Sequence, residues 1–150
     1  MTNALTVANT VLYRAFGENR DITPMKLQKM VYFVYKKYLK DTGYPLFPER
    51  FEAWQYGPVL TSVYEEFKSY ASNHIKDYCK SNDGKAWIVD MDESEEIAEA
   101  FDFVWAKYSQ FDGIYLSGLT HMPETAWDSA VKNDKVFLSD DDIKNEGWFA

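Results

Sequence analysis

Apolar residues recur at helical spacing in the first third of the chain. Between residues 4 and 16 they stand three or four positions apart, Asn3 before them is suited to an N-cap, and the pattern stops near Gly17. A second such segment begins at Thr23-Pro24 and stops before Gly43, as expected of a helix with proline in its first turn and glycine after its end. The stripe that it is predicted to bury is Leu27, Met30, Val31, Val34 and Tyr38.

Lysines occupy the other face of this second predicted helix. Lys26, Lys29, Lys37 and Lys40 all lie off its apolar stripe. Charged side chains on the polar face of an amphipathic helix are usually solvated. The pattern therefore predicts an exposed basic face, suited to solvent or to contact with an acidic protein.

A backbone break interrupts the chain at Gly57-Pro58. Glycine permits positive φ, while proline fixes its own φ and keeps the residue before it out of the helical region. We expect positive φ at Gly57 and a helix from about Val59 to Tyr70, with Pro58 in its first turn.

The second half of the chain combines one short strand with several helices. Asn82-Asp83-Gly84 is typical of a tight turn, and residues 86–91 are predicted to be a strand in a hairpin that starts near Ile75. Asp92 and Glu95 have the spacing of a capping box before a helix that continues to about Tyr108. Further helices are expected at residues 114–121, at residues 124–131 and after Ser139.

Composition agrees with a single compact helical domain spanning residues 1–150. A chain of 150 residues with 46% hydrophobic residues is long enough to bury one core, and no low-complexity tract divides it. The predicted fold class is mainly α with a small β-hairpin element.

Charge is distributed unevenly along the chain. Residues 1–75 carry nine Lys and Arg against seven Asp and Glu, whereas residues 76–150 carry seven against seventeen, which gives the total of −8. Such a balance disfavours nucleic acid as a partner, because binding phosphates requires clustered Lys and Arg. An acidic half would instead complement a basic protein.

The sequence also favours a cytoplasmic protein. No apolar run approaches the roughly 20 residues that cross a bilayer, and the first residues lack the pattern of a signal peptide. The single cysteine, Cys79, cannot form an internal disulfide, which suits a reducing compartment. We expect no membrane partner.

His121 is the one residue placed like a catalytic group. It lies beside Thr120 and near Glu124 and Asp128, and an imidazole oriented by a carboxylate can act as a general base. A nucleophile is missing, since Cys79 belongs to no cysteine-protease signature. We favour a structural histidine that bonds the backbone near Trp127, and we predict no catalytic residue.

Metal and cofactor sites have little support in the sequence. His74 and Cys79 would supply two ligands from one segment and His121 a third from elsewhere, whereas structural zinc favours four ligands in two close pairs. No nucleotide-binding or metalloprotease motif occurs. We therefore predict no metal and no cofactor.

Aromatic residues gather around the Gly57-Pro58 break. Trp54, Tyr56 and Tyr64 are suited either to fixing this segment onto the core or to presenting it to a partner, because aromatic side chains supply large contact area at small entropic cost. We favour the first interpretation.

Three motifs in order resemble a known family. They are the helix start Thr23-Pro24-Met25-Lys26-Leu27-Gln28-Lys29, the segment Phe51-Glu52-Ala53-Trp54-Gln55-Tyr56-Gly57-Pro58-Val59, and Leu116-Ser117-Gly118-Leu119-Thr120-His121 followed by Trp127. Together they resemble the Panacea domain family of SocA-like antitoxins and prophage-associated proteins. One departure is that the family pattern has proline just before the last tryptophan, where this chain has Ala126.

The resemblance implies a non-enzymatic, antitoxin-like protein-binding module. Its partner would be a cognate toxin, encoded by the adjacent gene and neutralised by direct contact, with delivery to a Clp-type protease as a further mode. Two alternatives stay open: a small hydrolase that uses His121 with a nearby carboxylate, and a prophage-encoded protein that binds a host factor. The motif residues to which the resemblance gives a structural or partner-binding role are Lys26, Leu27, Gln28, Trp54, Gly57, Pro58, Val59, Thr120, His121 and Trp127.

Overall fold

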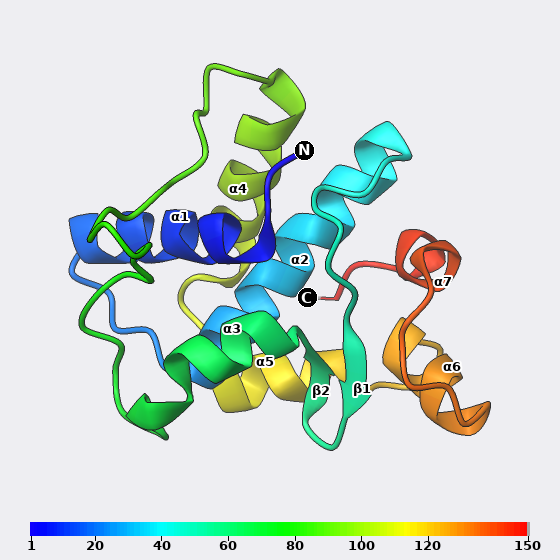
Figure 1. Cartoon of the computed structure of the whole chain (residues 1–150). Coiled ribbons are helices and arrows are strands. Elements are labelled where there is room, and N and C mark those ends of the chain that lie inside the picture. Colours follow the sequence, from blue (N-terminus) through cyan, green and yellow to red (C-terminus); the bar gives the residue numbers. More distant parts are fainter. Residues whose placement is uncertain (150) are drawn as a thin grey trace.

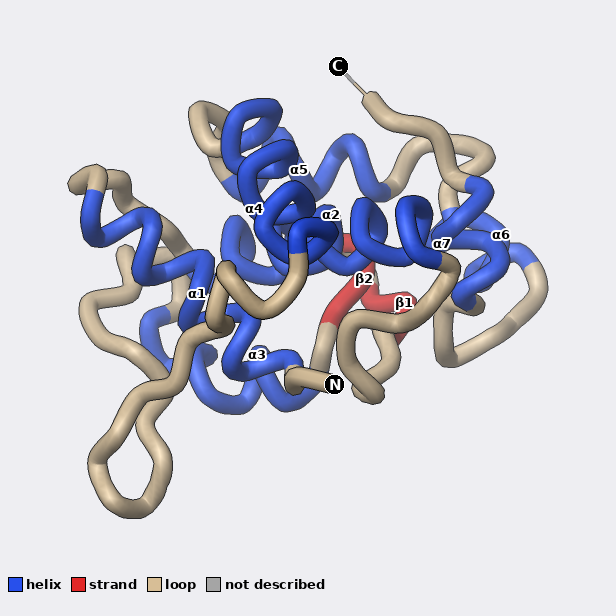
Figure 2. The backbone as a smooth tube through the Cα atoms, turned by 90° about the horizontal axis from the view of Figure 1, so that it is seen from above, coloured by secondary structure: helices blue, strands red, loops and turns tan. Residues whose placement is uncertain are grey.

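Helix α2 lies at the centre of the molecule and the other elements pack around it. The computed structural model describes residues 1–149. Helices α1 (Ala4–Gly17), α4 (Glu95–Tyr108) and α5 (Gly113–Thr120) all contact α2 (Pro24–Thr42), as Figures 1 and 2 show. Because α2 is surrounded, most of its residues are buried, including Tyr32 and Phe33.

The two N-terminal helices begin and end where the sequence predicts. The side chain of Asn3 accepts from the backbone of Thr6, and that of Thr23 accepts from the backbone of Lys26 with Pro24 in the first turn. Gly43 ends α2 in the left-handed region, at φ +80°. These predictions are confirmed because each rests on a local hydrogen bond or a local backbone restriction.

A two-stranded antiparallel hairpin follows α2, at a different place from the predicted one. Strand β1 (Glu52–Trp54) pairs with β2 (Gly57–Val59), so that Ala53 lies opposite Pro58. Gly57 has φ +113°, as expected, but Pro58 lies in a strand and not in the first turn of a helix.

The helix predicted from Val59 starts later, as α3 (Thr61–Phe67), and continues into a 3₁₀ turn (Lys68–Tyr70). The cause is Gln28, whose side-chain amide binds both the N–H and the carbonyl of Leu60 and holds that residue extended. A tertiary contact thus overrides the local preference.

Residues 71–94 form a long loop, and the strand predicted at residues 86–91 is wrong. The backbone of this loop finds its partners on α1: the Asn9 side chain bonds Cys79 and Trp87, and the Thr10 hydroxyl accepts from Val89. No second strand is needed, because helix side chains supply these bonds. The turn at residues 82–84 is present, with Gly84 at φ +81°.

Helices α4 and α7 (Asp140–Asn145) contact α2, while α6 (Ala126–Lys132) packs against α7 and β1. Ser94, and not the predicted Asp92, caps α4, because its hydroxyl accepts from Ile97. Helices α6 and α7 begin after Thr125 and Ser139. Over residues 1–149 the fold therefore has seven α-helices and one small hairpin, which confirms the predicted class.

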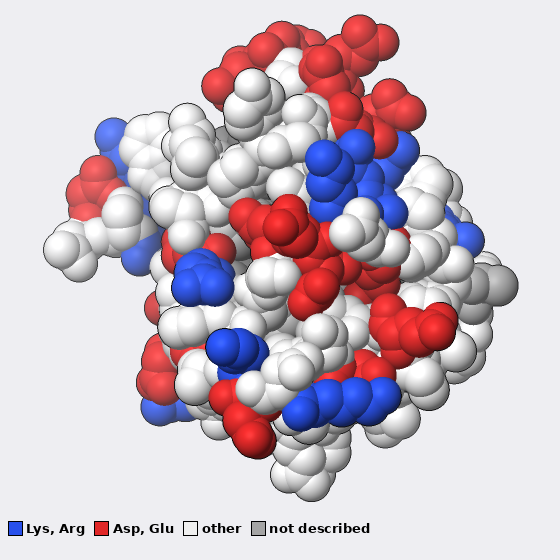
Figure 3. Space-filling view, turned by 90° about the vertical axis from the view of Figure 1, so that its right-hand side faces the viewer, with Lys and Arg blue, Asp and Glu red and all other residues white. Residues whose placement is uncertain are grey.

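Acidic side chains gather at the top of the face in Figure 3, on the side where Figure 1 places the start of α4. Glu95 and Glu96 lie in the first turn of that helix, where the helix dipole favours negative charge. Among the described residues, no helix has both the length and the apolar character needed to span a membrane.

Candidate functional site

The three sequence motifs meet at the hairpin. From α2, the Gln28 amide donates to the Leu60 carbonyl at 2.9 Å and accepts from its N–H at 3.0 Å. The next residue, Lys29, donates from Nζ to the Pro58 carbonyl at 3.0 Å. Two buried polar side chains of the first motif therefore bind the backbone at the C-terminal end of the second motif.

Side chains of the third motif bind the end of β1 and the turn of the hairpin. Trp127 Nε1 donates to the Trp54 carbonyl at 2.6 Å, and Ser117 Oγ donates to the Tyr56 carbonyl at 2.6 Å. His121 Nε2 lies 2.7 Å from the Gln55 carbonyl oxygen. Side chains thus bind the carbonyls of three consecutive hairpin residues, in addition to those of Pro58 and Leu60. We call this arrangement the hairpin clamp.

Gly57 is required for two reasons. Its φ of +113° is strained for any residue with a side chain. A Cβ at this position would also lie 2.5 Å from Thr120 Oγ1 and 3.1 Å from Lys29 Nζ. Thr120 cannot easily move, because it is buried and its hydroxyl donates to the Ser117 carbonyl at 2.8 Å. The glycine lets the first and third motifs close on the second.

His121 contacts backbone and an aromatic ring. Its Nδ1 lies 2.7 Å from the Ser117 carbonyl oxygen and its ring packs edge-on against Trp127, with centroids 4.5 Å apart. The nearby Asp128 carboxylate accepts from the Glu124 N–H and pairs with Lys132 at 2.9 Å. These contacts favour the structural interpretation of His121.

Neither Ser117 nor Cys79 is placed to act as a nucleophile with His121. Ser117 Oγ lies 3.5 Å from Nδ1, but its proton is directed to the Tyr56 carbonyl. Burial, with a contribution from Glu66, raises the pKa of the Cys79 thiol to about 11, so this thiol is protonated and a poor nucleophile at neutral pH. Cys79 is held against α1, where its backbone N–H donates to the Asn9 side chain.

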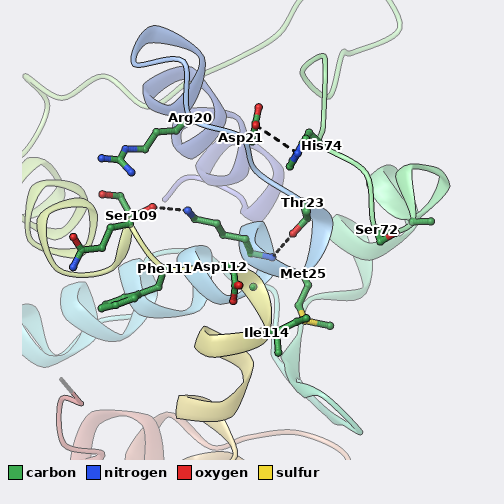
Figure 4. A pocket seen from close by; sticks show the side chains of 14 residues that line it. Arg20, Asp21, Thr23, Met25, Ser72, His74, Ser109, Phe111, Asp112 and Ile114 are labelled. Carbon is green, nitrogen blue, oxygen red and sulfur yellow. Dashed lines mark hydrogen bonds and ion pairs between the residues drawn. The ribbon is translucent and has the colours of Figure 1, made fainter.

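The predicted exposed basic face of α2 is wrong at Lys26 and Lys29. Lys26 is 7% exposed and Lys29 is 1% exposed, because α5 and the hairpin cover this end of the helix. Lys26 Nζ donates to the Ser109 carbonyl at 2.5 Å, as the dashed line in Figure 4 marks. Lys26 binds the carbonyl of Ser109, just after α4, and Lys29 binds that of Pro58 in β2, so each lysine gives a backbone carbonyl a hydrogen-bond donor.

Burial changes the proton affinity of both lysines. It lowers the pKa of Lys29 to about 7. It also lowers the pKa of Lys26, assisted by Arg20 and opposed by Asp112. A third buried lysine, Lys36, differs because its Nζ is 2.6 Å from the buried Glu146 carboxylate.

Glu146 binds the backbone just before Trp127, at the residue where the resemblance leads us to expect proline. Its Oε1 accepts from the backbone N–H of Ala126 at 2.8 Å and from the Tyr32 hydroxyl at 3.0 Å. Proline at residue 126 would have no N–H for this bond. Ala126 therefore allows the C-terminal segment to be tied to α2 through Glu146.

Two adjoining cavities lie along the N-terminal half of α2. One, of about 460 Å³, is shown in Figure 4; the other, of about 530 Å³, lies between α2, the hairpin and α3. Met25 and Ala71 line both, so we treat them as one groove and call it the α2 groove. Lys26 lines the first cavity and Lys29 the second.

The remaining motif residues divide between core and groove. Leu27, Pro58 and Val59 are buried, while Trp54 is half-buried, with its ring 4.8 Å from that of Tyr64 at the groove wall. The contact between Trp54 of β1 and Tyr64 of α3 is consistent with aromatic packing of the hairpin onto the fold, whereas Tyr56 is exposed, and the clamp adds hydrogen bonds to backbone carbonyls. No role in holding the hairpin is predicted from the sequence for Lys29, which is expected on the exposed basic face, or for Ser117; the place of both residues within the motifs was the only signal.

No metal centre is evident within residues 1–149, where no three His, Cys, Asp or Glu side chains are grouped so as to hold an ion. His74 instead faces Asp21 at 3.5 Å in the first cavity (Figure 4).

Comparison with known proteins identifies the family. The family described as "Antitoxin SocA-like, Panacea domain" matches residues 27–128, which include all residues of the clamp. Antitoxin SocA of Caulobacter vibrioides (strain NA1000 / CB15N) is 30% identical over 129 residues, covering 84% of this chain and 69% of the relative. No solved structure matches. The chain therefore belongs to the SocA-like Panacea domain family of antitoxins.

Proposed function

We propose that this protein is an antitoxin that neutralises a cognate toxin, encoded by the adjacent gene, by direct contact in the cytoplasm. Membership of the SocA-like family is the observation that carries the proposal. The hairpin clamp is consistent with it. The polar motif residues are bound to backbone groups of the chain itself, so they build a scaffold for binding surfaces.

Co-expression tests this proposal. The adjacent gene is placed under one inducible promoter and this protein under another. We expect induction of the adjacent gene alone to arrest growth, and induction of both to restore it. Arrest that persists at every matched expression level contradicts the antitoxin assignment. A neighbour that never arrests growth also contradicts it and favours a host factor as partner.

A finer form of the proposal is that the protein delivers its toxin to a Clp-type protease. The family resemblance supports this mode. The half-life of the toxin distinguishes delivery from inhibition: an adaptor shortens it only when the protease is present, whereas a simple inhibitor leaves it unchanged or lengthens it. The measurement is toxin decay after translation is stopped, in cells with and without the protease.

A further inference from the structure

Lys26 and Lys29 are buried, line the α2 groove and form no ion pair with any described residue, although Asp112 is near enough to Lys26 to oppose the lowering of its pKa. Within residues 1–149, no Asp or Glu oxygen lies within 4.0 Å of Nζ of Lys26 or Lys29, and each Nζ has one backbone carbonyl as its hydrogen-bond acceptor. An ammonium group has three protons to donate. Lys36 shows that this fold can supply a buried lysine with a carboxylate partner. At Lys29 it does not.

A buried lysine without a counter-charge costs stability. Moving a charged group out of water is unfavourable unless an opposite charge accompanies it. The lowered pKa of Lys29 reflects that cost. A carboxylate brought to Lys29 from another molecule would favour the ammonium form and offset the cost.

The lining of the groove is more basic than the chain as a whole. It contains Arg20, Lys26, Lys29 and Lys68 against Asp21 and Asp112, in a chain of net charge −8. Groups of both signs have partners within the chain: Asp21 faces His74, Asp112 caps α5 by accepting from Tyr115, and Lys68 pairs with Glu65. The groove is therefore complementary to an acidic surface.

The rim of the groove is apolar and exposed. Ile114 is 78% exposed beside the first cavity, where Met25 lies next to it in Figure 4. Tyr56 is 57% exposed beside the second, close to the paired rings of Trp54 and Tyr64. Exposed aromatic and aliphatic side chains around a concave centre are typical of protein-binding sites.

We propose that the α2 groove is the docking surface for the toxin, and that it receives an acidic side chain of the toxin flanked by apolar residues. The carboxylate would face Lys29 and Lys26, and the apolar neighbours would contact Tyr56, Tyr64 and Ile114. This inference rests on the proposed antitoxin function and adds to it the binding surface and the chemistry of the partner.

Charge reversal at the rim offers a matched test. Lys68, at the groove, pairs with Glu65 three residues before it; Lys80, on the loop bound to α1, pairs with Asp77 three residues before it. Their side chains are 51% and 48% exposed, so Lys68→Glu and Lys80→Glu make the same change in equivalent settings. Neither substitution touches the hairpin clamp.

The probe is the purified product of the adjacent gene, made inactive by substitution so that it can be produced. We expect Lys68→Glu to raise the Kd about tenfold at low salt and the difference to shrink at high salt, while Lys80→Glu stays within about twofold of wild type. Equal effects of the two variants, or a larger effect of Lys80→Glu, overturn the docking inference.

Lys29→Met tests the floor of the groove. Methionine keeps the length of the side chain but removes both the charge and the hydrogen bond to the Pro58 carbonyl, so the stability of the variant is measured beside its binding, and in a folded variant we expect the affinity for the same probe to fall about tenfold or more. Unchanged affinity in a folded variant overturns the inference. If Lys29→Met does not fold, the comparison of Lys68→Glu with Lys80→Glu decides the question.

The outcomes separate the two levels of the proposal. Absence of any binding by the wild-type protein overturns the antitoxin function and the docking inference with it. Wild-type binding that is insensitive to Lys68→Glu and Lys29→Met overturns the docking inference alone. Displacement of the probe by a single-stranded RNA oligonucleotide, in a manner that Lys68→Glu abolishes, would also overturn it in favour of a phosphate-binding groove.

Discussion

Gly57 lies so close to Thr120 that a Cβ on the glycine would come within 2.5 Å of the threonine hydroxyl oxygen. These residues are 63 positions apart in the chain; Gly57 belongs to the second motif and Thr120 to the third. Their contact shows why the motifs occur together: each needs the other to complete the hairpin clamp.

Gly57→Val should destabilise the protein by about 2 kcal/mol or more, because it combines a strained φ with a steric clash. Urea unfolding measures the change. Gly118→Ala is the control, since a Cβ at this helical glycine meets nothing within 4 Å and alanine should stabilise the helix by about 0.5–1 kcal/mol. Similar stability of Gly57→Val and wild type would contradict the clamp.

His121→Ala should lower stability and leave neutralisation intact wherever the protein remains folded. The substitution removes the ring contact with Trp127 and two ring nitrogens that each lie 2.7 Å from a backbone carbonyl oxygen, which costs about 1–3 kcal/mol. Cys79→Ser should retain neutralisation in the same assay. A His121→Ala protein with unchanged melting temperature and no activity would show that His121 has a chemical role.

Ala126→Pro tests the role of Glu146. Proline is favoured in the first turn of a helix, so local preference alone predicts no harm. We nevertheless expect a loss of about 1–3 kcal/mol, because the substitution removes the N–H that donates to the buried Glu146 carboxylate. The effect should be much smaller in a Glu146→Leu background, which has no acceptor for this N–H, and a double-mutant cycle measures the difference. Additive effects would contradict the coupling.

Lys29 should make stability increase with pH above neutrality. Its pKa is about 7 in the folded protein and near 10.5 in the unfolded chain, so the unfolded state binds more protons between these values. The free energy of unfolding should therefore rise by up to about 1.4 kcal/mol per pH unit from pH 7 toward pH 10. Urea unfolding at pH 7 and pH 9.5 measures the rise, which should be clearly smaller in Lys29→Met. An equal rise in both proteins would contradict the assignment.

The trend should reverse at higher pH. Burial raises the pKa of Tyr108 to about 12. Burial, together with the nearby Glu146 carboxylate, raises the pKa of Tyr32 well above its ordinary value. Unfolded tyrosines lose their protons near pH 10 while these two retain theirs, so stability should fall above that pH.

Features set by local chemistry could be predicted from the sequence. Asn3, Thr23 and Ser139 each cap a helix with their own side chain, and Gly43 and Gly57 adopt positive φ. These outcomes depend on a few adjacent residues. The three motifs also carried enough information to indicate the family.

Features set by contacts between distant segments could not be predicted. The start of α3 is delayed by Gln28, and the loop at residues 71–94 is bound by Asn9 and Thr10. Lys29 was expected in solvent because its position on α2 is off the apolar stripe, and only the packing of the hairpin buries it. The α2 groove likewise exists only after α3 and α5 are placed beside α2.

The most direct test of neutralisation by contact is a titration of toxin activity. Purified toxin is held at a fixed concentration while this protein is added in increasing amounts, and the remaining activity is measured at several times. Inhibition by contact predicts that activity falls in proportion to the antitoxin added, reaches zero at a fixed molar ratio and does not change with time. Complete loss of toxin activity at a small fraction of that ratio, progressing with time, would contradict the account and favour an enzymatic mechanism.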